Sequence, residues 1–280
     1  MNYKNKITKY GLVIPVILLA FASCKKMDHP PLGDYPKDTN PPGGPLKFYV
    51  AFDGTSNNIL LNSVDSIRAN FPASNTGTLA DGISGKSYKG SATAFVKFAA
   101  PNDFAKSSSF TVAFWVKKTV QPAASGTQFA FSLNRKDYSW TNTRFFLEFE
   151  DAGNPSTAAL AAAKFYVMDQ WVEYTKHTAS EDRMPNVLNG NWHHLAFTYN
   201  GTNSTLLAYI DGSLFHTNVI SGLGPVAFGA FDDFTIGGPD QYTHDKNTWM
   251  GFWDGQIDQF RLYGTILTAA EIQALYTNKQ

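Results

Sequence analysis

Short apolar segments separated by turn sequences run through the chain from residue 46 to residue 263. Segments rich in Phe, Tyr, Val and Thr are typical of β-strands. Asp-Gly and Asn-Gly pairs interrupt them, and such pairs supply the positive φ angles of tight hairpins. Because no helical periodicity lies between the segments, the pattern predicts an all-β antiparallel sandwich or barrel. The predicted strands cover residues 47–52, 110–117, 128–133, 144–150, 164–168, 192–199, 205–210, 233–237 and 256–263.

The C-terminal segment has the pattern of a single helix. Thr268 and Glu271 have the spacing of a capping box, in which each side chain bonds to the backbone of the other residue. Ile272, Leu275 and Tyr276 then fall on one helical face. We therefore expect a short amphipathic helix that packs on the sandwich as a lid.

The N-terminal segment has a different pattern. Lysines at positions 4, 6 and 9 precede an apolar stretch, residues 11–21, that is too short to span a membrane, and Ala22-Ser23-Cys24 follows. This resembles a bacterial lipoprotein signal, although Phe21 stands where that family usually has Leu. The resemblance implies cleavage of residues 1–23 and lipidation of Cys24. An ordinary secretory signal and an uncleaved anchor are the alternatives.

Residues 24–45 have the composition of a tether. Residues 25–45 contain six of the fourteen prolines and almost no residue that could be buried. Such a sequence favours extended polyproline II structure. A tether that holds the protein off a membrane and a linker that keeps a secreted domain soluble share this composition. Residues 46–280 contain no second linker and are predicted to form one domain.

Charge and cysteine content exclude several classes of function. The chain has 23 basic and 23 acidic residues and no basic run beyond the first ten positions, which argues against a nucleic-acid partner. Without residues 1–23 it carries 20 basic and 23 acidic groups, a net charge of −3, so acyl chains alone would attach it to a membrane. A single cysteine excludes an intrachain disulfide and a zinc ribbon. The expected location is the bacterial envelope, most simply the outer membrane, with either orientation open.

Three stretches of the predicted domain resemble the laminin-G-like, concanavalin A-like jelly-roll family. They are FTVAFWVKK (110–118), NWHHLAFTYNG with LLAYIDGSL (191–214), and DGQIDQFRLYGTILTAAEIQALY (254–276). The resemblance implies two curved antiparallel sheets of six or seven strands. It also implies binding of carbohydrate or protein, and less often cleavage of glycans. Residues 151–188 depart from the family pattern and are interpreted as an insertion.

Catalytic chemistry finds little support in the sequence. Glycosidases of this fold alternate acids along one strand, because alternate residues face the same cleft. Only Glu148 and Glu150 approach that Glu-x-Asp-x-Glu pattern, but its middle Asp is absent and no acid stands at position 152. The favoured interpretation is two solvated acids on the outer face of a strand whose Phe145, Leu147 and Phe149 face the core. No catalytic residue is predicted.

Metal binding is the next candidate. His193 and His194 are neighbours in a strand, so they point to opposite faces and cannot share an ion. Asp258 alternates with Phe260 and Leu262, which places it on the core-facing side, where a carboxylate needs a cation or several donors. In the resembling family, first and last strands usually pair and often hold a structural Ca²⁺. The resemblance therefore nominates Asp53 and Asp258 as calcium ligands. The alternative is that Asp53 caps a turn through its own backbone and that Asp258 accepts backbone N–H bonds or pairs with an arginine.

Residues 240–253 form the most informative segment for ligand binding. Aromatic faces stack on sugar rings, while carboxylates and amides bind hydroxyl groups. We predict a glycan site here, with a second aromatic loop around Trp140. The alternative is that Phe252 and Trp253 plug the rim of the sandwich. The predicted ligand-binding residues are Asp240, Tyr242, His244, Asp245, Asn247, Trp249 and Trp140.

Three classes of function therefore remain. The first is a noncatalytic, lipid-anchored recognition module whose partner is a glycan. The second is a glycan-cleaving hydrolase or lyase, which the incomplete acid pattern disfavours. The third is an adhesion domain that binds protein partners at the envelope. The sequence does not separate glycan from protein ligands, because both would use the rim loops.

Overall fold

The computed structural model describes residues 44–53, 77–120, 126–135, 144–149, 155–175 and 182–279. The chain divides into two units, Met1–Thr39 and Asn40–Gln280, and all described residues lie in the second. Cys24, Trp140 and Glu150 fall outside the described residues, so the predicted signal, tether and domain boundaries stay predictions. None of the helices in the described ranges has the length and apolarity that crossing a bilayer needs.

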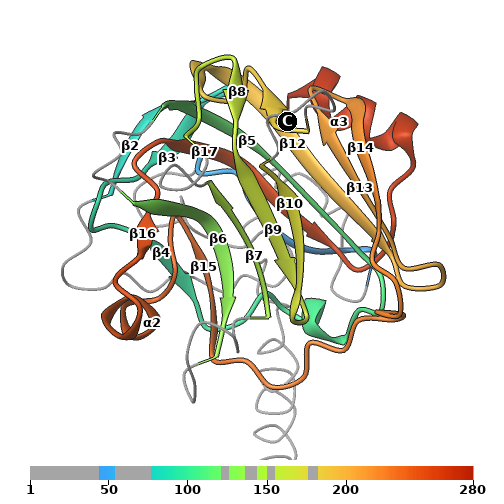
Figure 1. The fold of residues 1–280 in the computed structure, drawn as a ribbon. Coiled ribbons are helices and arrows are strands. Elements are labelled where there is room, and N and C mark those ends of the chain that lie inside the picture. Colours follow the sequence, from blue (N-terminus) through green and yellow to red (C-terminus); the bar gives the residue numbers. More distant parts are fainter. Residues whose placement is uncertain are drawn as a thin grey trace, which may run out of the picture. The chain divides into compact units, whose positions relative to one another are not determined.

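The described residues fold into two large facing sheets (Figure 1). The strands are β1 (Leu46–Val50), β2 (Thr78–Asp81), β3 (Lys86–Lys89), β4 (Val96–Phe98), β5 (Phe110–Thr119), β6 (Thr127–Asn134), β7 (Phe145–Phe149), β8 (Leu160–Ala161), β9 (Ala163–Val167), β10 (Gln170–Tyr174), β11 (Met184–Pro185), β12 (Asn189–Asn200), β13 (Thr205–Ile210), β14 (Ser213–Val219), β15 (Asp233–Ile236), β16 (Met250–Phe252) and β17 (Gln256–Tyr263). The helices are η1 (Phe104–Lys106), α2 (Gln241–Lys246) and α3 (Ala269–Asn278).

The eight-stranded sheet has the order β14-β13-β12-β5-β17-β3-β2, and β1 also pairs with β17. The seven-stranded sheet has the order β10-β9-β7-β6-β15-β4, and β16 pairs with β6 as the one parallel pair among the described strands. This is the predicted antiparallel sandwich, with one strand more in the larger sheet than the six or seven expected. All nine predicted strands are present.

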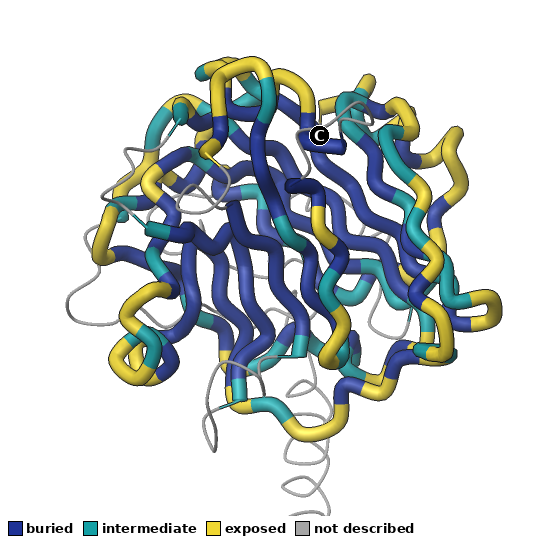
Figure 2. Tube along the Cα trace, in the orientation of Figure 1, coloured by how far each residue is buried: buried dark blue, intermediate teal, exposed yellow. Residues whose placement is uncertain are grey.

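The core lies between the two sheets and is rich in phenylalanine (Figure 2). Phe145, Leu147 and Phe149 of β7 all face this core, as the alternation predicted. The rings of Phe145 and Phe149 meet those of neighbouring strands edge to face or tilted, with centroids about 5 Å apart, as between Phe110 and Phe145 at 5.1 Å. Each fully buried side chain of this size contributes about 1.5–3 kcal/mol through burial of apolar surface.

The predicted insertion forms ordinary sheet. Within residues 151–188, β9 and β10 extend one edge of the seven-stranded sheet, and β8 pairs with β11 as a separate small ladder. Strands β2 and β14, which the pattern did not predict, carry mostly exposed side chains, so they show no alternation of apolar and polar residues. Such strands are held by their neighbours and not by a buried face of their own.

Helix α3 covers the outer face of the eight-stranded sheet. The capping box of Thr268 and Glu271 is present, with both reciprocal hydrogen bonds. Ile272 is fully buried against Ala113 and Ala196, and Tyr276 stacks on Trp115 with ring centroids 5.5 Å apart. The predicted lid helix is confirmed, because its apolar face has a sheet surface to cover.

Candidate functional site

The predicted ligand-binding segment is not one long loop. It contains helix α2 and strand β16, and β16 aligns in parallel beside β6. Asp240 is the N-cap of α2, and its Oδ1 accepts a 2.7 Å hydrogen bond from the backbone N–H of Thr243. An Asp at this position satisfies one of the donors that a helix start leaves without a partner. The Asp240 carboxylate therefore stabilises the start of the helix. Asp240 is 1% exposed.

His244 and Asn247 are also engaged within this segment. The Nδ1 of His244 lies 2.8 Å from the main-chain oxygen of Met250, and its ring packs on Phe252. Asn247 ends the helix, and its side-chain amide donates to the main-chain oxygen of Thr243 at 3.1 Å. These contacts hold α2 against β16. Asp245 is exposed and accepts a hydrogen bond from Gln241 on the same helix.

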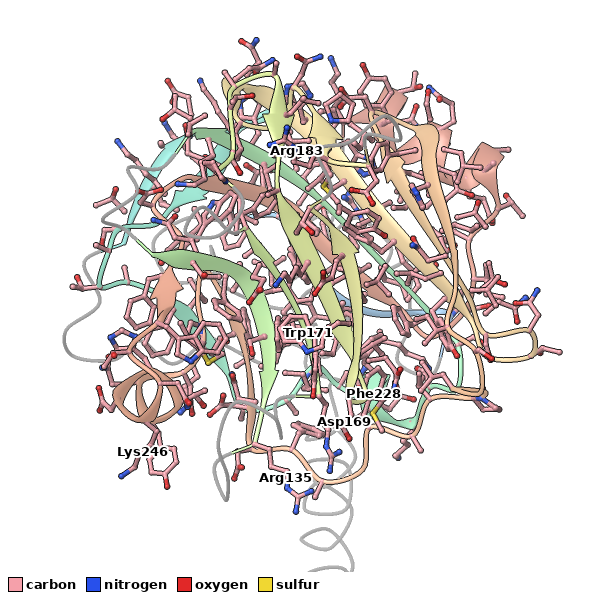
Figure 3. The ribbon with its side chains drawn as sticks, viewed as in Figure 1. Arg135, Asp169, Trp171, Arg183, Phe228 and Lys246 are labelled. Atoms are coloured by element: carbon pink, nitrogen blue, oxygen red, sulfur yellow. The ribbon has the colours of Figure 1, made fainter. Side chains whose placement is uncertain are left out.

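Two aromatic side chains of the segment face solvent. Tyr242 is 44% exposed and Trp249 is 40% exposed, and the described residues contain few other large apolar groups so accessible. The ammonium of Lys246 lies 5.8 Å from the Tyr242 ring centre, and Figure 3 shows Lys246 at the outer side of α2. Of the predicted ligands that the structure describes, Tyr242, Trp249 and Asp245 are thus the accessible ones.

An aromatic row crosses the outer face of the seven-stranded sheet, starting at Trp249. Trp249 lies 5.8 Å from Phe129, which lies 4.9 Å from Phe146, measured between ring centroids. Phe146 stacks on Tyr166 at 4.7 Å, and Tyr166 meets Trp171 at 4.9 Å. Phe129, Phe146 and Tyr166 are buried, so accessible ring surface remains at the two ends, Trp249 and Trp171. Figure 3 labels Trp171 in the sheet's β9–β10 region.

Charged groups flank this aromatic row. Glu148 on β7 pairs in register with Lys164 on β9. Lys164 lies over the Trp171 ring at 5.4 Å and contacts Glu173 at 3.6 Å. Glu148 is only 1% exposed, so the expectation of a solvated acid at this position is wrong. Around β7 the outer face of this sheet is buried too. The alternation of residues along one strand does not reveal such burial.

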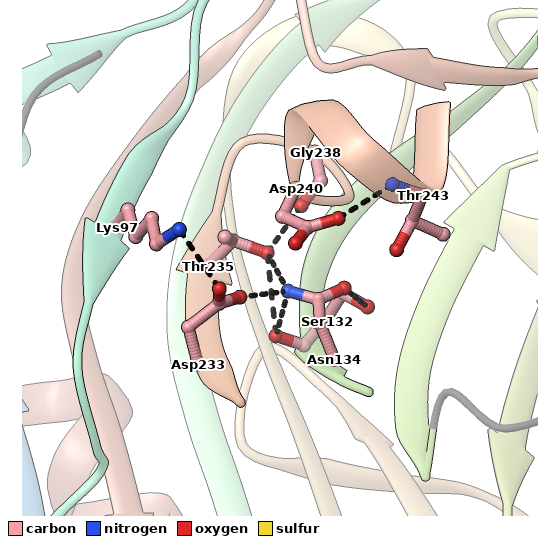
Figure 4. Close-up of polar contacts among 8 residues, drawn as sticks. All are labelled: Lys97, Ser132, Asn134, Asp233, Thr235, Gly238, Asp240 and Thr243. Atoms are coloured by element: carbon pink, nitrogen blue, oxygen red, sulfur yellow. Dashed lines mark hydrogen bonds and ion pairs between the residues drawn. The ribbon is translucent and has the colours of Figure 1, made fainter. Parts of the chain in front are cut away.

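A buried polar network lies beside the row, between β4, β6 and β15 (Figure 4). The Asn134 side-chain amide donates to Asp233 at 2.9 Å and to Thr235 at 3.0 Å. Lys97 contacts the other Asp233 oxygen at 2.9 Å. Thr235 donates to the main-chain oxygen of Gly238 at 2.6 Å, two residues before the cap of α2. The network therefore anchors the segment that carries Tyr242 and Trp249.

Trp253 is not part of the accessible surface. Its side chain is fully buried in the sandwich core, 5.2 Å from Phe149, and Phe252 is 4% exposed. The Lys118 ammonium lies 5.1 Å from the Trp253 ring centre. Phe252 and Trp253 are rim plugs, as the alternative interpretation of this segment held.

The nominated calcium ligands do come together. First and last strands pair, with Val50 opposite Phe260. Beyond that pair, Asp53 accepts from the Lys86 N–H at 2.5 Å, and Asp258 accepts from the Ile83 N–H at 2.8 Å. Both carboxylates thus bind the turn of the β2–β3 hairpin.

Asp258 is buried, but not for the predicted reason. A bulge at Gln259, which has φ +48°, shifts the alternation of β17. Ile257 instead shares the core with Phe260, and Asp258 is paired with Trp115 on the opposite face. Asp258 is 0% exposed, and no hydrogen-bond partner among the described residues reaches its Oδ1. Burial raises the pKa of Asp258 to about 7, against the Ile83 hydrogen bond and with the added repulsion of Asp53.

The two adjacent histidines point to opposite faces, as predicted. His193 lies 2.8 Å from Asp211 and 3.1 Å from Asn189. His194 packs against Trp115 beneath α3. The described residues contain no group of three or more His, Cys, Asp or Glu side chains that could hold a metal.

The sequence alone did not predict the aromatic row or the polar network. Phe146, Tyr166 and Trp171 lie directly opposite one another on β7, β9 and β10, so an alignment of these strands would reveal their common face. Alignment needs the order β6-β7-β9-β10, which is a tertiary property. The network of Lys97, Asn134 and Asp233 joins strands far apart in sequence and leaves no local signal.

Comparison with known proteins identifies the superfamily of this chain. Residues 89–273, more than half of the chain, match the family model described as the concanavalin A-like lectin/glucanases superfamily. The chain belongs to this superfamily. No curated protein is significantly similar to it in sequence.

Several solved structures resemble this superfamily member. Domain 4 of a GH43 extracellular arabinanase from Geobacillus stearothermophilus, in complex with arabinotriose, is 22% identical with a TM-score of 0.55, covering 82% of this chain and 98% of that one. The binding domain of Paraclostridial Mosquitocidal Protein 1 is 14% identical with a TM-score of 0.57 over 84% of this chain and 52% of that one. A botulinum neurotoxin type C structure, whose cell entry depends on two ganglioside molecules, is 14% identical with a TM-score of 0.53 over 84% and 51%. At these identities the likeness shows the fold.

Proposed function

We propose that the protein is a noncatalytic, lipid-anchored glycan-recognition module of the bacterial envelope. The observation that carries this proposal is the pair of exposed aromatic side chains, Tyr242 and Trp249, on a segment fixed by α2 and β16. Exposed rings on a rigid support stack on sugars with little loss of conformational entropy. The arabinotriose and ganglioside ligands of similar folds support a glycan ligand.

Trp249→Ala tests the proposal. The full-length protein is titrated with a panel of oligosaccharides that includes arabinotriose. We expect the variant to bind at least about tenfold more weakly, or about 1.4 kcal/mol. Its melting temperature should change little, because Trp249 is 40% exposed. Trp253→Ala should instead lose about 3–5 kcal/mol of stability, because a buried ring is removed.

The matched control is Leu214→Ala, which removes a 54% exposed apolar side chain from β14 in the other sheet. It should leave binding unchanged. Unfolding of Trp249→Ala, or no glycan binding by wild type at millimolar concentration, would contradict the glycan site and favour a protein ligand.

We also propose that a calcium ion binds at the junction of β1 and β17. The residues present fit the ion: one oxygen of Asp258 is buried without a described partner, and Asp53 faces the same hairpin turn. A Cβ on Gly82 would collide with the Asp258 carboxylate, and one on Gly85 with that of Asp53. Asp53 and Asp258 would hold the ion, with backbone oxygens completing the shell. Bound calcium would neutralise two neighbouring carboxylates and fix the hairpin to β17.

A glycan hydrolase is the second candidate function. The observation that favours it is Glu148, a buried carboxylate beside the aromatic row and in register with Lys164. If it were a catalytic acid, Glu148→Gln would lower release of reducing sugar from a β-glucan or an arabinan by at least ~10²-fold. Glu173→Gln on the same face is the control. We expect wild type to release none; release that only Glu148→Gln abolishes would establish the hydrolase.

A further inference from the structure

A basic pocket lies in the eight-stranded sheet, lined by residues of β3, β5 and β17 and of the turn before β17. Its volume is about 250 Å³, and its lining includes Lys89, Lys117, Lys118 and Asp254. The charged residues of the lining are three lysines and one aspartate, so the residues that form it carry a net positive charge. This stands out in a chain whose basic and acidic residues are equal in number.

The strand register places the two outer lysines side by side. Gln256 of β17 is paired with Lys89 of β3 on one edge and with Lys117 of β5 on the other. Directly paired residues point to the same face of a sheet, and two strand spacings separate the lysine Cα atoms by about 10 Å. Gln256 donates to the main chain of Asp81 and to Ser87, which fixes the middle of the row.

Lys118 is already neutralised, whereas the outer lysines are not. Lys118 is buried at 2% exposure and pairs with Asp254. Within the described ranges, no acid pairs with Lys89 or Lys117. Two ammonium groups on the same face of the sheet can both donate to an oxyanion that lies between them.

Two glycines form part of the pocket wall. Gly190, with φ +87°, lies where the β12–β5 register shifts, and Gly255 forms another part of the wall. A Cβ on Gly255 would stand 2.8 Å from the Trp253 Nε1 and 2.9 Å from the Lys117 oxygen. Any larger residue at position 255 would therefore need its neighbours to move.

An aromatic ring extends the row beyond the lysines. Trp192 of β12 is paired with Lys117, so it projects from the same face, and it is partly exposed. A ring beside two cations suits a sugar that carries an acidic group, because the ring stacks while the ammonium groups bind the acid.

We propose that Lys89, Lys117 and Trp192 form a second binding site, for an acidic glycan that carries a carboxylate or sulfate group. The site lies on the eight-stranded sheet and is independent of Trp249. This site would recognise the acidic group of a glycan, whereas the first site would stack on an uncharged sugar ring.

The test compares a galacturonic acid hexamer with a neutral galactose hexamer, using the full-length protein in a neutral detergent. We expect wild type to prefer the acidic hexamer by about tenfold or more. Lys89→Gln with Lys117→Gln should abolish the preference. Lys106→Gln with Lys279→Gln, which removes the same charge elsewhere, should keep it. Equal weakening by both pairs, or no acidic preference in wild type, would overturn the site, while loss of neutral binding in Trp249→Ala would still support the first site.

A second measurement separates a glycan from a free anion. Inorganic sulfate, at constant ionic strength, should protect Lys89 and Lys117 from an amine-acylating reagent, as followed by peptide mass spectrometry. Trp192→Ala should keep this protection but bind the acidic hexamer more weakly. Protection by sulfate without any binding of the hexamer would show that the ligand is a free oxyanion, and would overturn the glycan assignment.

Discussion

His194 is a buried imidazole under the C-terminal helix. It is fully buried beside Trp115 and Tyr276, and neither ring nitrogen has a hydrogen-bond partner among the described residues. Burial lowers the pKa of His194 to about 3, and the positive charge of Arg261 adds to this against the attraction of Asp211. The folded protein therefore holds this ring neutral.

This environment predicts a dependence of stability on pH. The unfolded chain takes up a proton at His194 near pH 6.5, whereas the folded protein does so only near pH 3. The free energy of unfolding should therefore fall as the pH drops below 6.5, by about 2 kcal/mol at pH 5. His194→Leu should remove this contribution. Urea unfolding at pH 7.5 and pH 5 measures it.

Ile272→Val is the control, because Ile272 lies on the helix that covers His194 and does not titrate. It should lower stability by about 0.5–1.5 kcal/mol at both pH values. An equal pH dependence in wild type and His194→Leu would show that His194 is not the group responsible.

At the scale of elements, β1 and the β2–β3 hairpin meet along one edge of β17. On one edge of β17, β3 pairs with residues 256–257 and β1 pairs with residues 260–263. Asp258 lies in the gap between these two partners. The hairpin turn closes the gap through the hydrogen bonds to Asp53 and Asp258.

If calcium binds this junction, it should stabilise the fold. Calcium at 100 times its dissociation constant should raise the free energy of unfolding by ~2.7 kcal/mol, and EDTA should lower the melting temperature accordingly. Asp258→Asn should remove the response. Asp81→Asn, an exposed acid of the same hairpin, should keep it. A wild-type melting temperature that EDTA leaves unchanged would mean that both aspartates only hold the turn.

At the scale of the whole molecule, the prediction concerns attachment. Cys24 is the single cysteine and follows the apolar segment 11–21. Cys24→Ala should abolish labelling by a radioactive fatty acid and release the protein from the membrane fraction. Phe21→Leu, which matches the lipoprotein pattern more closely, should keep both. Membrane retention of Cys24→Ala at the wild-type level would contradict the lipid anchor.

Local pattern was sufficient for the nine predicted strands and for the lid helix. Phe145, Leu147 and Phe149 recur at every second position because one face of β7 packs in the core between the sheets, and a core-facing strand face repeats with a period of two. The capping box at Thr268 is equally local, since both partners lie within one helical turn. The all-β class followed from these elements.

The site depended on contacts that no local pattern contains. Asp240, His244 and Asn247 have the composition of ligands, yet they cap and brace α2, because a short helix forms where a loop was predicted. A single bulge at Gln259 placed Asp258 on the face opposite to the predicted one.

The sequence by itself determined nine of the strands, the start of the lid helix and the resemblance to the jelly-roll family. Only the tertiary structure decided that Trp249 is exposed while Trp253 is buried, and that Lys89 and Lys117 lie on either side of Gln256. The physical reason is that burial and register arise from strands distant in sequence. A side chain's neighbours across the sheet are set by the order of the strands, and that order is a property of the whole fold.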